Sequence, residues 1–116
     1  MHELPITERI LDVVLRHAAG QDVHRIVRVH LRVGALADLE DHWIQHYFNY
    51  LSRGTLAENA ELAITRAPIR VRCRSCACSF EITREDLGKA TCPGCGETGC
   101  ELVSGREYFI ENMEVL

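Results

Sequence analysis

Apolar residues recur at helical spacing over residues 6–19. This spacing predicts an amphipathic helix. Pro5 is acceptable in a first helical turn and Gly20 suits a helix end, so both flanks agree with that prediction. Its buried face is expected to comprise Ile6, Ile10, Val13, Val14 and His17, widened by Leu11, Leu15 and Ala18.

A second helix is predicted between the first long strand and the middle of the chain. It is expected to begin at Asp38 or Asp41 and to run to about Ser52, because Gly54 then stops the pattern. The apolar side chains expected on its inner face are Trp43, Tyr47, Phe48 and Leu51.

Strict alternation of apolar and polar residues over 27–33 predicts a half-buried strand that ends at Gly34. A second strand is predicted at 61–66, before Pro68, and a third at 106–115 that enters the same sheet. The side chains expected to point inward from the first strand are Val27, Val29, Leu31 and Val33.

Four cysteines form two matched C-x2-C pairs, Cys73 with Cys76 and Cys92 with Cys95. This spacing is typical of a tetrahedral zinc site, because each two-residue spacer lets a tight turn aim two sulfurs at one ion. Gly94 and Gly96 are expected to supply the positive φ that such turns need. Since four thiolates close the coordination sphere, the sequence predicts a structural zinc and argues against a zinc enzyme.

Other interpretations of the cysteines are weaker. A secreted disulfide framework would need an export signal, and the N-terminus lacks the basic and apolar regions of a signal peptide. A thioredoxin-like site needs a single C-x-x-C that opens a helix. Cys78 and Cys100 are left over and are expected to be half-buried ribbon residues, although Cys78 could replace Cys76 through a two-residue slip.

Bulk composition limits the remaining choices. The chain has 116 residues, 47% of them hydrophobic, and a formal net charge of −4. That length fits one domain, or one small domain with a smaller appendage. Free thiols without an export signal predict a cytoplasmic protein, and no apolar run is long enough for a membrane span. Net acidity disfavours nucleic-acid binding.

The N-terminus gathers several nitrogen donors. The α-amine of Met1 and the backbone nitrogen and imidazole of His2 lie within a few covalent bonds of one another, and Glu3 adds a further donor by its backbone or side chain. A planar nitrogen set suits Ni(II) or Cu(II) better than zinc. The amine and imidazole must lose protons to bind, so nickel affinity is expected to fall steeply between about pH 7.5 and 6. His42 and His46 are interpreted as the solvated edge of the second helix.

These features together resemble the HypA/HybF family of hydrogenase maturation nickel metallochaperones. The resemblance covers essentially the whole chain. It is carried by Met1-His2-Glu3, by residues 33–36 (VGAL), by residues 53–58 (RGTLAE) and by the order of the two cysteine pairs.

The resemblance implies an α+β fold, in which a small two-helix nickel-binding domain with a three-stranded sheet carries an inserted four-cysteine zinc ribbon. The nickel-binding domain would comprise residues 1–69 and 104–116, and the ribbon residues 70–103. The implied ligands are Met1, His2 and Glu3 for Ni²⁺, with Glu40 or else Asp38 nearby, and Cys73, Cys76, Cys92 and Cys95 for structural Zn²⁺.

The same resemblance implies a carrier and not an enzyme. Its partners would be a nickel-handling GTPase and the large subunit of [NiFe]-hydrogenase, and in some members urease maturation proteins as well. An alternative function is a zinc-ribbon module that binds protein or nucleic acid and has no nickel role.

Overall fold

The computed structural model describes residues 3–116, so the predictions for Met1 and His2 lie outside the described residues. Within the described chain, both predicted helices and all three predicted strands are present, and further short strands surround the cysteines. The elements in chain order are α1 (Glu3–Ala18), β1 (Ile26–Gly34), α2 (Asp41–Leu51), β2 (Glu61–Ala67), β3 (Ile69–Cys73), β4 (Ser79–Ile82), the 3₁₀ turn η1 (Arg84–Asp86), β5 (Cys100–Ser104) and β6 (Tyr108–Val115).

The chain divides into two compact units. One, here called the helical unit, comprises the described residues up to Arg32 together with Asp38–Thr65 and Phe109–Leu116. The other, here called the cysteine unit, comprises Val33–Ala37 and Arg66–Tyr108. This arrangement of two helices, a three-stranded sheet and a second sheet bearing the cysteines confirms the predicted α+β class.

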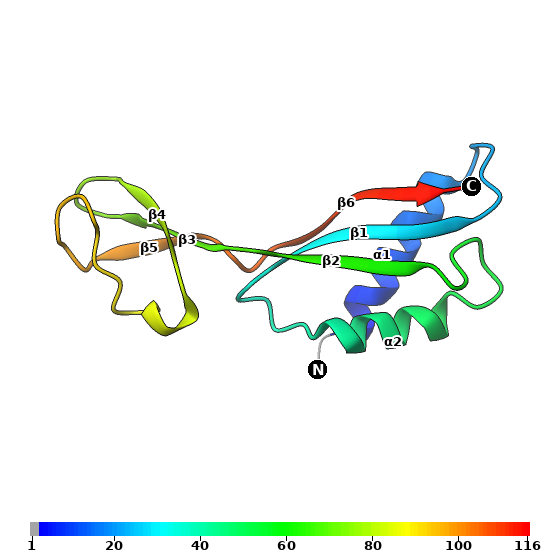
Figure 1. Ribbon diagram of the computed structural model, residues 1–116, viewed down its shortest axis with the longest axis horizontal. Coiled ribbons are helices and arrows are strands. Elements are labelled where there is room, and N and C mark those ends of the chain that lie inside the picture. Colours follow the sequence, from blue (N-terminus) through cyan, green and yellow to red (C-terminus); the bar gives the residue numbers. More distant parts are fainter. Residues whose placement is uncertain (1–2) are drawn as a thin grey trace. The chain divides into compact units, whose positions relative to one another are not determined.

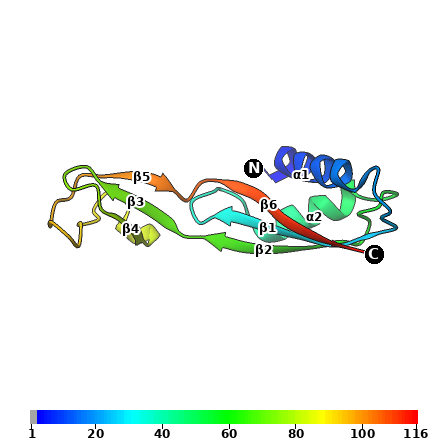
Figure 2. The same ribbon diagram turned by 90° about the horizontal axis from the view of Figure 1, so that it is seen from above.

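The helical unit is organised around the sheet β2-β1-β6. This order confirms that the last strand of the chain enters the sheet formed by the first two (Figure 1). Both helices lie on the same face of that sheet (Figure 2). The alternation in β1 leaves Val29, Leu31 and Val33 buried, as predicted, while Val27 is half-buried.

The predicted buried face of α1 was partly wrong. Val13 is 37% exposed and His17 is exposed, whereas Ile10, Leu11 and Val14 are buried. The buried stripe is rotated because it continues through two polar residues at the start of the helix, Glu3 and Thr7. Sequence periodicity counted only apolar side chains and therefore missed this end of the stripe.

The face of α2 needs a similar correction. Ile44 and Phe48 are fully buried, whereas Trp43 is 37% exposed and Tyr47 is half-buried. The i, i+4 pair of Ile44 and Phe48 fills the core, so the aromatic side chains one position earlier on each turn lie at its rim. The prediction gave too much weight to aromatic size and omitted Ile44 altogether.

Across the helical sheet, Glu114 of β6 bridges two side chains of β1. Its Oε2 accepts hydrogen bonds from Arg28 Nη1 at 2.9 Å and from His30 Nε2 at 2.7 Å. These bonds, that of Arg28 first, lower the pKa of Glu114 below the ordinary carboxyl range. The two hydrogen bonds of Glu114 join β6 to β1 on a polar surface of the sheet.

The cysteine unit contains the second sheet, in the order β4-β3-β5. Both neighbours run antiparallel to β3, and Cys73 at its end lies opposite Cys100. One position before that pair, Arg72 faces Glu101, and its Nη2 lies 2.6 Å from Glu101 Oε1. The sheet therefore holds the first cysteine of the chain on its central strand.

Two glycines meet backbone to backbone in the cysteine unit. A Cβ on Gly34 would lie 2.1 Å from the carbonyl oxygen of Gly105, closer than atoms can approach. Gly34 also donates its N–H to Glu107 O at 2.7 Å. Any side chain at position 34 would push these two backbone segments apart, so the end of β1 requires a glycine.

Candidate metal centre

The two cysteine pairs sit in turns with the same hydrogen bonds, here called knuckles. In the first, Cys73 N donates to Cys78 O and Ala77 N donates to Cys73 O, both at 2.9 Å. In the second, Cys92 N donates to Glu97 O and Gly96 N donates to Cys92 O, again at 2.9 Å. The same local fold therefore arises twice from different spacer residues.

Each knuckle has one residue in the left-handed region, four positions after its first cysteine. That residue is Gly96 in the second knuckle, with φ of 79°, as predicted. In the first knuckle it is Ala77, with φ of 62°, where a Cβ is unfavourable. The prediction for Gly94 was wrong, because it is not among the glycines with positive φ. Instead, Gly94 N donates to Cys92 Sγ at 3.3 Å.

The four predicted cysteines come together at one point. Their sulfur atoms all lie within 4.8 Å of one another. Two of the pairs, Cys73 with Cys95 and Cys76 with Cys92, are each 3.5 Å apart. A tetrahedron with Zn–S bonds of about 2.3 Å has sulfur–sulfur edges of about 3.8 Å. The cluster therefore fits a zinc ion, with Cys73 and Cys92 buried and Cys76 and Cys95 exposed.

Backbone N–H groups polarise one thiol of each knuckle. For Cys73, the N–H groups of Cys76 and Ser75 lower the pKa of the thiol. Burial opposes ionisation of Cys92, but the N–H groups of Cys95 and Gly94 and neighbouring thiols outweigh it and lower its pKa to about 6. Both buried cysteines are thus prepared to bind a cation as thiolates.

In the two exposed cysteines, Cys76 and Cys95, the pKa of the thiol is raised instead of lowered. The Glu97 N–H favours ionisation of Cys95, but the neighbouring thiols, Cys73 first, raise its pKa to about 12. Four sulfurs this close cannot all ionise without a cation between them. Binding of a divalent metal would remove this conflict and release protons.

Cys78 and Cys100 are both half-buried, as predicted. Cys78 does not replace Cys76, since Cys76 belongs to the four-sulfur cluster and the Cys78 thiol lies 3.9 Å from Ser79 O. Burial, followed by the nearby thiols of Cys73 and Cys92, raises the pKa of Cys100. That neighbourhood has no signal in the sequence, because it depends on the strand register.

At the other predicted metal site the structure describes Glu3 alone of the three ligands. Glu3 is 5% exposed, and its Oε2 accepts the N–H of Glu40 at 3.1 Å. Thr7 Oγ1 also donates to the Glu3 carbonyl at 2.5 Å. Glu40 is the N-cap residue of α2, so the Glu3 carboxylate lies where a helix N-terminus favours negative charge. Asp38 is exposed in the preceding loop.

His42 and His46 both contact Trp43, their ring centroids lying 5.1 Å and 5.6 Å from that of the indole. Trp43 in turn stacks on Tyr47 at 5.8 Å. Among the described residues, these histidines belong to no group of three or more metal ligands. This agrees with their interpretation as the solvated edge of α2.

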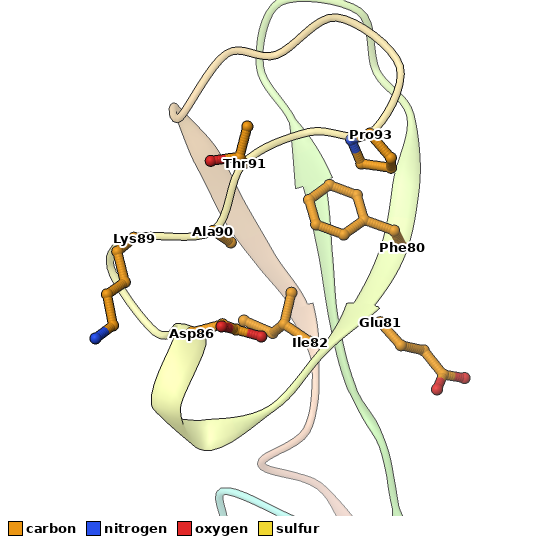
Figure 3. Close-up of a pocket in the computed structure, with 8 residues that line it drawn as sticks. All are labelled: Phe80, Glu81, Ile82, Asp86, Lys89, Ala90, Thr91 and Pro93. Atoms are coloured by element: carbon orange, nitrogen blue, oxygen red, sulfur yellow. The ribbon is translucent and has the colours of Figure 1, made fainter.

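A pocket of about 470 Å³ lies in the cysteine unit. Phe80 and Ile82 of β4 point into it toward the loop that carries Lys89 and Pro93, while Glu81 points away (Figure 3). Pro93 belongs to the second C-x2-C pair, so the shape of this pocket depends on the knuckle.

A family model for hydrogenase/urease nickel incorporation metallochaperones, HypA, matches residues 1–115. The chain belongs to this family. Among curated relatives, the hydrogenase maturation factor HypA of Dehalococcoides mccartyi is 35% identical over 115 residues, covering 99% of this chain and 94% of that protein. The factor of the same name from Geobacter sulfurreducens is 36% identical over 116 residues and covers 99% of both chains.

The solved structures extend the likeness to the fold. The solution structure of the Ni metallochaperone HypA from Helicobacter pylori matches with a TM-score of 0.69 at 21% identity, covering 100% of this chain and 98% of that one. A second HypA solution structure gives a TM-score of 0.75 at 22% identity, covering 100% and 97%. The family consists of metallochaperones, so the expectation of a carrier is confirmed and the protein is not an enzyme.

A search of the described residues found no helix with the length and hydropathy that a membrane span requires.

Proposed function

We propose that this protein binds one Ni(II) at its N-terminus through Met1, His2 and Glu3 and delivers it during hydrogenase maturation. The observation that carries this proposal is the match to the nickel-incorporation family over residues 1–115, in a chain that begins Met-His-Glu. A terminal site is exposed to partners and inexpensive to rearrange, which suits a protein that must release its cargo.

The surroundings of Glu3 support a backbone donor over a carboxylate donor. Its carboxylate is buried and occupied by the Glu40 N–H at 3.1 Å. Withdrawing it to bind nickel would leave the start of α2 without that acceptor. In this proposal Glu3 supplies its backbone nitrogen to nickel, and its side chain anchors the start of α1 to the start of α2. The contact joins Glu40 to Glu3, which supports Glu40 over Asp38 as the neighbouring carboxylate.

The four-cysteine cluster holds a structural zinc ion in this proposal. Cys73, Cys76, Cys92 and Cys95 leave no coordination position for a substrate. We assign residues 70–103 to the zinc ribbon and residues 1–69 and 104–116 to the nickel-binding domain. The short strands β3, β4 and β5 carry or flank the knuckles, so zinc would fix this sheet and its turns together.

The proposed partners rest on the resemblance to the family. A nickel-handling GTPase would receive or exchange the metal with this chain, and the large subunit of [NiFe]-hydrogenase would be the destination. The family description includes urease as well, so urease maturation proteins are further candidates.

Nickel titration calorimetry on untagged, zinc-loaded protein tests the nickel site. We expect one Ni(II) per chain in the wild type and none in His2→Ala, with zinc retained in both. A glycine inserted before Met1 keeps His2 but converts the amine to an amide, so it should weaken binding sharply. Affinity should also fall between about pH 7.5 and 6, where the amine and imidazole gain protons.

Glu3→Ala distinguishes the two possible donors of Glu3. Nickel should still bind with one equivalent, because the backbone nitrogen remains, and affinity should fall no more than about 10- to 100-fold through loss of positioning. Loss of nickel as complete as in His2→Ala would identify the carboxylate as the ligand.

Equal binding by wild type and His2→Ala would move the site elsewhere. No binding by either would favour a zinc-ribbon interaction module.

A further inference from the structure

Cys100 faces a zinc-site cysteine directly across two strands. It lies opposite Cys73 in the antiparallel register of β3 and β5. At the next position, Arg74 N donates to Gly99 O at 2.8 Å, which marks that pair as hydrogen-bonded. Positions alternate along an antiparallel ladder, so Cys73 and Cys100 occupy a closely spaced position, with Cα atoms about 4.5 Å apart. This spacing lies within the range of about 4.4–6.8 Å for disulfides.

The side chains agree with the approach indicated by the register. After burial, a nearby Cys73 thiolate is the first cause that raises the pKa of the Cys100 thiol. Cys100 is half-buried and begins β5, whereas Cys73 is 1% exposed. A small reagent from solvent therefore reaches Cys100 before it reaches Cys73.

The other spare cysteine provides a comparison within the same chain. Cys78 immediately precedes β4, and its thiol is directed to the carbonyl of Ser79 at 3.9 Å. Continued by one position, the register of β3 and β4 also places Cys78 opposite Cys73, and the Cys78 carbonyl accepts the Cys73 N–H at 2.9 Å, but the Cys78 thiol is directed to Ser79 O and not to a cluster sulfur. Of the two cysteines outside the cluster, Cys100 is thus the one positioned for exchange with a cluster sulfur.

We propose that Cys73 and Cys100 form an oxidant-sensitive pair whose disulfide releases the zinc ion. The oxidant is a small hydroperoxide. The Cys100 thiolate, a minority species because the pKa of this thiol is raised, attacks one oxygen of hydrogen peroxide, the O–O bond breaks, and Cys100 sulfenic acid and hydroxide form. Cys73 then leaves the metal and attacks the Cys100 sulfur, so an S–S bond forms, the S–O bond breaks and hydroxide leaves.

Two sulfurs together give two electrons to the peroxide, and zinc departs unchanged as Zn²⁺. Three thiolates remain at the site, and a structural zinc site needs four ligands. The inference rests on the proposed zinc occupancy of the cluster and is independent of the nickel site. It makes zinc retention, and with it the fold of the cysteine unit, dependent on a reducing environment.

Zinc release on treatment with hydrogen peroxide tests this pair. Wild-type, Cys100→Ser and Cys78→Ser proteins, each first shown to hold one zinc per chain, are treated in the presence of a chromogenic zinc chelator. We expect Cys78→Ser to release zinc at the wild-type rate. Cys100→Ser should release it at about one tenth of that rate or below, because the first sulfenic acid cannot form. Equal rates in all three would overturn the proposal.

Disulfide mapping of the oxidised wild type gives an answer that needs no variant. Trypsin cuts after Arg74, between Cys73 and Cys76, and a glutamate-specific protease cuts after Glu97, between Cys95 and Cys100, so the two digests together locate each bond. We expect Cys73 linked to Cys100, and reduction with dithiothreitol followed by added zinc should restore one zinc per chain. Bonds confined to the C-x2-C pairs would contradict the proposal. Protein that holds no zinc before oxidation would instead overturn the proposed zinc function.

Discussion

The two units of this protein are stabilised in different ways. The helical unit has an apolar core formed by both helices and the sheet, with Ile44, Phe48 and Ile26 among its fully buried side chains. The cysteine unit buries fewer aliphatic side chains, and two of its most buried residues are the metal-site cysteines Cys73 and Cys92. From Cys92 to Gly99, this unit has no regular helix or strand.

This difference shows how a small polar segment can keep a defined shape. Burial of apolar surface contributes about 25 cal/mol per Å², so a segment with few buried side chains gains little from its core. A metal ion replaces part of that core, because its binding free energy becomes folding free energy. We therefore expect the stability of each unit to respond to a different perturbation.

Removal of zinc should have the largest effect, and the effect should be confined to the cysteine unit. Structural zinc contributes about 10–16 kcal/mol of apparent binding free energy in small zinc domains. A strong chelator should abolish amide-exchange protection in β3 and β5, while α1 and α2 retain theirs. Full protection of both units after zinc removal would contradict this division of stability.

Phe48→Ala is the reverse perturbation. Phe48 is completely buried, so its truncation should cost about 3–5 kcal/mol of unfolding free energy in the helical unit. Zinc stoichiometry should stay at one per chain. Trp43→Ala, at the exposed rim of the same helix, is the control and should cost less than about 1 kcal/mol. Urea denaturation followed by circular dichroism measures both unfolding free energies. A larger loss of stability in Trp43→Ala than in Phe48→Ala would support the sequence prediction that Trp43 lies in the core.

Substitution of the residue with positive φ in either knuckle should have the smallest effect, a modest change in zinc affinity. Gly96→Ala places a Cβ where φ is 79° and should weaken zinc binding by about 1 kcal/mol, a factor of about five. Ala77→Gly removes such a Cβ at φ of 62°, and should strengthen zinc binding by roughly 0.5 kcal/mol after the entropy cost of glycine. Competition with a chelator measures both affinities. Changes of the same sign would show that the knuckles are not equivalent.

Periodicity in the sequence located the helices and the strands of the main sheet, because both regular structures repeat at fixed intervals. It failed at the faces of the helices. Glu3 and Thr7 are buried polar residues whose hydrogen bonds compensate their burial, and apolar counting omits them. Trp43 was assigned to the core because a large aromatic residue suits one, although the smaller Ile44 occupies that place.

The sequence by itself determined the chemistry of this protein: the donors at its N-terminus, the two C-x2-C pairs and the order of its elements. These are local properties, since a turn or a chelate needs only residues that are neighbours along the chain. The tertiary structure decided which distant groups meet. It directed the Glu3 carboxylate to the N–H of Glu40 and placed Cys100 opposite Cys73. Such pairings depend on packing and strand register, which arise from the whole chain and not from any one segment.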